Sequence, residues 1–139
     1  LTGNISSLSG TQALSILFPG DQFWLNESVN TTDASSTLIL AWGVPNSANQ
    51  VTTLDATVTA VSDSDNLAVF KFLAVFNHDS TATFTLKDVV TLNGPYKSVG
   101  AATWNMTVSA GVSTVLVSVT GQAATNIKWR LTGRLIQDG

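Results

Sequence analysis

Apolar and polar side chains alternate along the last third of the chain. In 103–110 every second residue, beginning with Trp104, is apolar, and the residues between are Thr, Asn or Ser. In 127–136 the face that holds Trp129 is again apolar. Successive side chains of a strand point to opposite faces, so a period of two predicts half-buried β-strands. The opposite face of the second segment carries three of the six cationic residues of the chain, Lys128, Arg130 and Arg134.

Earlier segments alternate in the same way, and polar turn sequences separate them. These segments are 37–44, 51–62, 67–77 and 81–92. A short apolar run at 13–18 precedes a Pro-Gly-Asp turn, and a valine-rich strand ends at Gly121. No segment shows the 3.6-residue period of a helix. We therefore predict an all-β fold, an antiparallel, jelly-roll-like β-sandwich of about eight strands, whose order the pattern leaves open.

Three local features complete the predicted organisation. Residues 1–12 are rich in Ser, Gly and Thr, which predicts a linker or lead-in, and 13–139 form a single β-sandwich domain. After the Pro-Gly-Asp turn a strand continues to Leu25, and 26–36 is expected to be a polar loop. Segment 37–44 is apolar on both faces, which predicts an interior strand with Leu38 in phase with Trp42.

Composition narrows the classes of protein. A chain of 139 residues fits one domain, and its lack of cysteine excludes disulfides and thiolate metal sites. The net charge of −3 and the scattered basic residues argue against nucleic-acid binding. No apolar run approaches the length of a membrane span and the start lacks a signal sequence, so we expect a mature or trimmed soluble domain without membrane insertion.

Segment 67–77 is the most hydrophobic predicted strand, and both of its faces are apolar. Phe70 and Phe72 share one face, whereas Leu67 and Val69 lie on the other. In a monomeric sandwich, one face of each sheet is normally exposed to solvent and polar. The second apolar face therefore predicts that another subunit or a loop covers this strand. The low charge, 11% of residues, also fits a subunit with extensive contacts. The candidate subunit interface is Lys71, Leu73, Val75, Lys128, Arg130 and Arg134.

Several short motifs follow one another from about residue 51 to the end of the chain. They are paired strands around Phe70-Lys71-Phe72 and Thr83-Phe84-Thr85, Ala-x-Trp-x-x-x-Val at Ala102, Val-x-Val-Thr-Gly at Val117, and Ile-x-Trp at Ile127. This pattern resembles a β-sandwich module of tailed-bacteriophage virion proteins, found in tail-fibre, knob, spike and head-decoration components. The resemblance implies a non-enzymatic structural or adhesive subunit on the virion surface, usually a homotrimer. Assembly and host attachment would be its roles, and other virion proteins and a host-surface glycan its partners, with no cofactor.

Few residues of the sequence could take part in catalysis or metal binding. His78 stands beside Asp79 in a strand connection, without a Gly-x-Ser-x-Gly elbow, and is interpreted as an exposed turn histidine. Asp63 and Asp65 offer oxygens for calcium, but the full calcium-loop pattern is absent, which favours a solvated turn. One histidine without cysteine argues against zinc. No carboxylate pair accompanies Glu27, so a hydrolase is disfavoured.

The four tryptophans divide into two groups. Trp42, Trp104 and Trp129 share faces with apolar residues and are expected in the core. Exposed aromatic rings suit receptor or sugar contacts. A stand-alone carbohydrate-binding β-sandwich of a secreted protein is therefore the alternative to a virion protein. The candidate receptor or partner contacts are Trp24, Tyr96 and Lys97.

Overall fold

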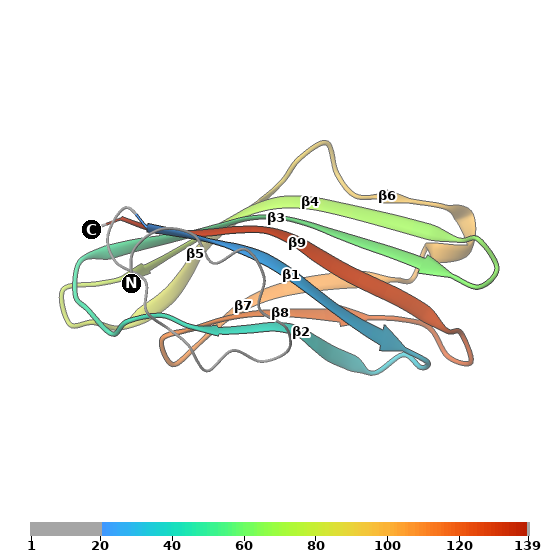
Figure 1. The fold of residues 1–139 in the computed structure, drawn as a ribbon, viewed down its shortest axis with the longest axis horizontal. Coiled ribbons are helices and arrows are strands. Elements are labelled where there is room, and N and C mark those ends of the chain that lie inside the picture. The colour runs from blue at the N-terminus through green and yellow to red at the C-terminus, as the bar shows by residue number, and fades with distance from the viewer. Residues whose placement is uncertain (1–20, 139) are drawn as a thin grey trace.

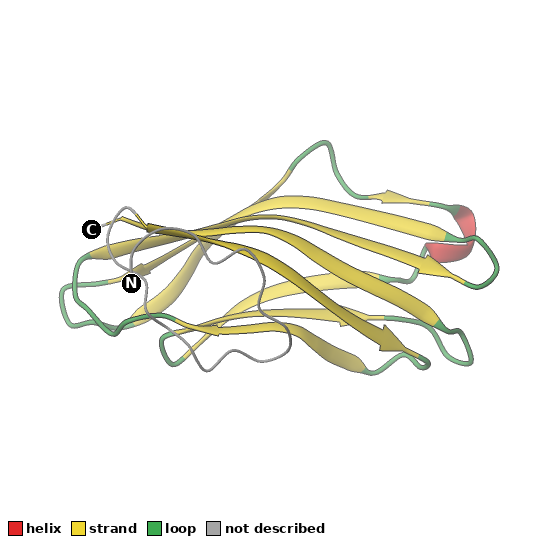
Figure 2. Ribbon diagram, viewed as in Figure 1, coloured by secondary structure: helices red, strands yellow, loops and turns green. Residues whose placement is uncertain are grey.

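Two antiparallel β-sheets face each other in the computed structural model, which describes residues 21–138 (Figures 1 and 2). The larger sheet has the order β1-β9-β3-β4-β5, with β6 also paired to β4, and the smaller has the order β2-β8-β7. The predicted all-β antiparallel sandwich is confirmed. Its elements are β1 (Asp21–Thr31), β2 (Ser36–Gly43), β3 (Gln50–Ser62), β4 (Leu67–His78), β5 (Phe84–Thr91), β6 (Tyr96–Lys97), the 3₁₀ turn η1 (Val99–Ala101), β7 (Asn105–Gly111), β8 (Thr114–Thr120) and β9 (Ile127–Asp138).

The first strands pair with the last. β1 pairs with β9 in the larger sheet and β2 pairs with β8 in the smaller. The chain changes sheets four times, at 32–35, 44–49, 98–104 and 121–126. This wrapped pairing is shared with jelly rolls. In contrast, β3, β4 and β5 follow one another within the larger sheet as a meander. The connection between β5 and β6 rises above β4 in the view of Figure 1.

The core lies between the sheets and is built from the inward faces of the strands. Trp42, Trp104 and Trp129 are buried, which confirms the prediction for these three side chains. The Trp129 Nε1–H donates to Thr31 Oγ1 at 2.9 Å, and the Trp104 Nε1–H donates to Gln122 Oε1 at 3.0 Å. These two indole N–H groups therefore find the partners that buried donors usually have, whereas the Trp42 Nε1–H has none among the described residues.

β1 is longer than the sequence suggested, and the polar loop predicted for 26–36 is confined to 32–35. The strand runs to Thr31 and pairs with β9 along its whole length. Its inward positions after Leu25 include Glu27 and Thr31, which are buried although they are polar. Polar residues on both faces conceal the period of two, so alternation of hydrophobicity does not detect this half of the strand.

β2 differs from the prediction in two ways. The register with β8 shifts between Leu38 and Leu40, so Ile39 and Leu40 are both buried while Leu38 is 49% exposed. A β-bulge of this kind reverses the phase of the side chains. Within residues 21–138 β2 pairs only with β8, so it is an edge strand of the described sheet and not an interior one. The expected linker at 1–12 and strand at 13–18 lie outside the described residues.

Candidate functional site

One surface collects nearly all the residues singled out from the sequence. It is the side of the larger sheet turned away from β2, β8 and β7, called here the outer face. Eight of the nine candidate contacts project from it, as the register places their strands side by side. Lys97 is the exception, because its Nζ lies 5.6 Å from the ring centre of the buried Phe70. The eight are Trp24, Lys71, Leu73, Val75, Tyr96, Lys128, Arg130 and Arg134.

The outer face carries most of the exposed large hydrophobic side chains of the described residues. Of the eleven exposed large hydrophobic side chains in the described part of the chain, seven lie on it. Single exposed hydrophobic residues are ordinary, but a concentration on one face marks an interaction surface. The seven are Trp24, Val51, Val61, Leu67, Leu73, Val90 and Tyr96.

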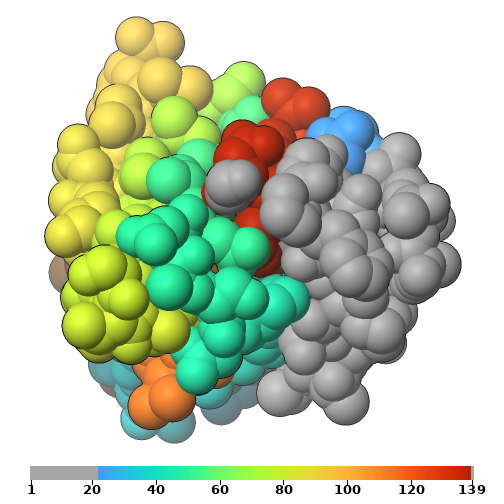
Figure 3. Space-filling view, turned by 90° about the vertical axis from the view of Figure 1, so that its left-hand side faces the viewer, coloured from blue at the N-terminus to red at the C-terminus, as the bar shows by residue number. Residues whose placement is uncertain are grey.

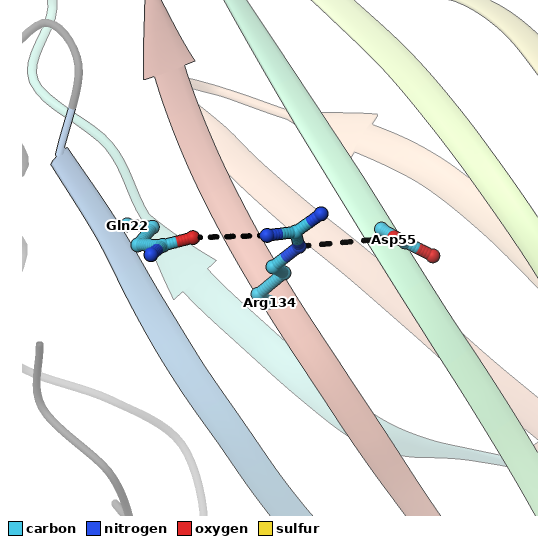
Figure 4. A network of polar contacts seen from close by, with 3 residues as sticks. All are labelled: Gln22, Asp55 and Arg134. Carbon is cyan, nitrogen blue, oxygen red and sulfur yellow. Dashed lines mark hydrogen bonds and ion pairs between the residues drawn. The ribbon is translucent and has the colours of Figure 1, made fainter.

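A polar network crosses three strands of the outer face (Figure 4). Arg134 on β9 donates from Nη1 to Gln22 Oε1 on β1 at 3.2 Å, and its Nε lies 3.8 Å from Asp55 Oδ2 on β3. The guanidinium carbon is 5.8 Å from the Trp24 ring centre. These side chains are partly exposed, so the ion pair adds little stability. Its effect is positional, since it holds Arg134 beside Trp24 and occupies the Asp55 carboxylate.

A groove of about 520 Å³ lies toward the other end of the same face. It spans β1, β9, β3 and β4. Its floor is formed by Ala60, Ala68 and Trp129, whose side chains lie on the core side of the strands. Its lining mixes two cations, three hydroxyl or amide side chains and three aliphatic ones. The outward lining residues are Ser28, Asn30, Thr59, Val61, Leu67, Val69, Lys128 and Arg130.

His78 is buried, and its interpretation as an exposed turn residue is wrong. It is the last residue of β4, and its ring lies 4.6 Å from that of Phe84. The connections β2–β3, β4–β5 and β7–β8 meet at this end of the sandwich (Figure 3), where Val44 N–H donates to Ser113 O at 2.8 Å. His78 Nε2 is 3.1 Å from Ser113 Oγ, so the imidazole links β4 to the smaller sheet.

Ser113 is a residue that sequence analysis missed, and its pairing with His78 does not form a triad. Within residues 21–138 the His78 Nδ1 has no hydrogen-bond partner. The adjacent Asp79 Oδ1 instead accepts bonds from the Thr81 N–H and hydroxyl and from Thr83 N–H. A catalytic histidine needs a third group to orient it. The arrangement therefore favours a structural role for the pair.

The buried imidazole makes stability depend on pH. Burial lowers the pKa of His78 from 6.5, against a smaller opposing effect of Asp79. Protons then bind the unfolded chain more readily than the folded one, so the free energy of unfolding should decrease as the pH falls below 6.5. We expect His78→Gln to flatten this decrease in urea titrations between about pH 7 and pH 5. Equal slopes for the variant and the original chain would contradict the assignment.

Asp79 does not interfere with that measurement. A side-chain hydrogen bond from Thr81, followed by backbone bonds from Thr83 and Thr81, lowers the pKa of the Asp79 carboxyl from 3.8. Its contribution is therefore present above 3.8 and is lost only at lower pH. The turn at Asp63, which the sequence favoured as solvated rather than calcium-binding, has one side-chain contact to another loop, because Asp63 Oδ2 accepts from Asn126 Nδ2 at 3.1 Å. In the described part of the chain no three His, Asp or Glu side chains gather as metal ligands.

Comparison with known proteins does not assign the chain to a family. No protein-family model matches its sequence, and no curated protein matches it. Among the described residues, no helix is long and apolar enough to cross a membrane.

Proposed function

We propose that the chain is a non-enzymatic structural protein of a bacteriophage virion, a trimeric fibre, knob or capsid-decoration domain that acts in assembly and host attachment. The observation that carries this proposal is the concentration of exposed hydrophobic side chains on the outer face of a chain with few charges. The motif pattern from about residue 51 onward supports the virion context. Assembly would bury part of the outer face against a second copy.

The part of the outer face best suited to subunit contact is an aliphatic cluster, called here the apolar end. Register pairs Leu73 with Val90 and places Thr53 between Val75 and Ile136. Leu73 is 37% exposed and Val90 is 44% exposed, so both still have surface to bury. The apolar end consists of Val51, Leu73, Val75, Val90 and Ile136.

Charges around the apolar end complement one another. Asp88 is paired with Val75, and Asp138 is paired with Val51, so two acids border the aliphatic side chains. Lys71 and Arg134 lie on neighbouring rows of the same face. In a rotated neighbouring subunit these cations would meet the acids, which favours one orientation of the contact.

Mass in solution tests the proposal. Static light scattering should give about three times the chain mass of 14.6 kDa at micromolar concentration. Val90→Asp should dissociate the trimer, because it buries an unpaired charge in the contact. The matched control is Val112→Asp in the β7–β8 turn, where the side chain is 95% exposed and the mass should not change. A monomeric wild-type chain, or a trimer that tolerates Val90→Asp, would oppose the proposal.

One observation favours the alternative, a carbohydrate-binding module of a secreted protein. Trp24 and Tyr96 are 42% and 59% exposed and project from the same outer face. Such a module would be a monomer whose two rings stack on sugars. A glycan array with Trp24→Ala and Tyr96→Ala would detect this stacking, and a chain without any sugar signal would eliminate the alternative.

A further inference from the structure

We propose that the groove between β1 and β4 binds an acidic saccharide, a sugar that carries a carboxylate or sulfate group. This inference deepens the attachment part of the proposed function and is independent of the assembly part. The groove volume of about 520 Å³ lies within the range of small-ligand sites. It also lies apart from the apolar end, since Leu67 in the groove and Leu73 are six residues apart on β4, or about 20 Å.

The charge of the groove is positive and uncompensated. Lys128 and Arg130 occupy alternate positions of β9, so their Cα atoms are about 6.8 Å apart on one face. Neither side chain makes a hydrogen bond or ion pair with any other residue of 21–138, and no acidic residue lines the groove. Of the acids nearby, Asp55 is engaged by Arg134 and Asp63 by Asn126. A ligand anion would supply the missing partner.

The polarity of the lining changes across the strands. Ser28 and Asn30 on β1 and Thr59 on β3 offer hydroxyl and amide groups, whereas Leu67 and Val69 on β4 offer only aliphatic surface. A pyranose ring has the same division, with hydroxyl groups at its edge and C–H groups on its face. The cations stand on β9, which lies between β1 and β3 and so among the polar groups of the lining. The lining thus fits a sugar whose charged substituent and hydroxyl groups face β1, β9 and β3 and whose C–H face packs against β4.

An exposed aromatic ring extends the aliphatic side. Tyr96 on β6 is paired with Val69, so its side chain projects from the outer face next to the groove. The ring is 59% exposed and can stack on a second sugar unit. We therefore assign Tyr96 to the rim of the site.

Other polyanions fit the groove less well. β9 and β3 are interior strands with neighbours on both sides, so a peptide placed over them cannot add to the sheet through backbone hydrogen bonds. Nucleic acid binding requires many phosphate contacts. Two cations in a chain of net charge −3 provide few.

The experiment titrates the full chain with three probes, 3′-sialyllactose, tri-galacturonic acid and neutral lactose. Amide shifts in NMR spectra should centre on Thr59, Val69 and Arg130 for the two acidic sugars. Lactose should bind at least about tenfold more weakly, and added salt should weaken only the acidic sugars. The double variant Lys128→Gln with Arg130→Gln should lose at least about tenfold in affinity, as expected when charge-assisted hydrogen bonds are removed.

A matched variant controls for general loss of positive charge. Lys87→Gln removes an exposed cation at the β-bulge of β5, outside the groove, and should leave sugar affinity unchanged. The inference is overturned if neither acidic sugar binds, if the double variant binds as tightly, or if a glutamate oligopeptide binds more tightly than the sugars. Light scattering on the same samples separates the two proposals. If the chain is a monomer that binds sugar through Lys128 and Arg130, this inference stands and the proposed trimer is wrong. If the chain is a trimer that binds no sugar, the trimer stands and this inference is wrong.

Discussion

Replacing Trp129 with alanine is expected to lower the free energy of unfolding by about 3–5 kcal/mol. The side chain is 1% exposed, and its ring centre lies 6.1 Å from that of Trp104 and 6.4 Å from that of Phe70. Phe70 and Trp129 belong to the larger sheet, whereas Trp104 leads into β7 of the smaller one. Truncation would leave a cavity at the place where the two sheets are joined by aromatic packing.

Loss of the indole hydrogen bond is a second contribution to the lower free energy of unfolding. Trp129→Ala leaves the buried Thr31 hydroxyl without the donor that it accepts from. Trp129→Phe removes the N–H donor but keeps most of the ring volume, so its cost should be smaller, about 1–2 kcal/mol. Denaturant titrations at one protein concentration, monitored by circular dichroism, would give all three free energies of unfolding.

Trp24→Ala is the matched control, because it makes the same truncation at a ring that is 42% exposed on the outer face. We expect a loss of about 1 kcal/mol or less. Similar losses for Trp24→Ala and Trp129→Ala would show that the aromatic contact between the sheets is not a principal source of stability.

The elements that the sequence predicted correctly are those with apolar residues on their inward positions. In β3 the inward residues from Leu54 to Ala60 are all apolar, and in β9 those from Ile127 to Leu131 are apolar too, so the period of two is visible. In β1 the inward Glu27 removes this signal, and in β2 the bulge at Ile39 shifts its phase. Burial of His78 depends on the β7–β8 turn, which is distant in sequence.

The candidate site was predictable residue by residue but not as a surface. Alternation places Leu73 and Arg134 on the outward faces of their own strands. That these faces form one surface follows from β9 lying between β1 and β3, and pairing between such distant segments leaves no periodic signal. The groove walls at Ser28 and Thr59 were missed because a polar outward residue in a strand is ordinary. Only their position beside Lys128 and Arg130 distinguishes them.

Gly133→Ala is expected to cost about 3 kcal/mol or more, because the added methyl group has no room. Gly133 lies in the middle of β9, paired with Leu25 on one side and Ala56 on the other. A Cβ there would lie 2.7 Å from Ala56 Cα and 2.8 Å from Ala56 Cβ, and it would also meet the Asp55 carbonyl oxygen. These are largely backbone atoms of the neighbouring strand, so relief requires β9 and β3 to separate.

Gly111→Ala provides the comparison, since its Cβ would first meet Leu116 Cδ1 at 3.3 Å, a flexible side-chain end. We expect a loss within about 1 kcal/mol for this variant. Separation of β9 from β3 would also pull Arg134 from Asp55, so Gly133→Ala should change the fluorescence of Trp24, which borders that ion pair. A Gly133→Ala variant as stable as Gly111→Ala, with unchanged Trp24 emission, would mean that the two strands accommodate the methyl group without disturbing the outer face.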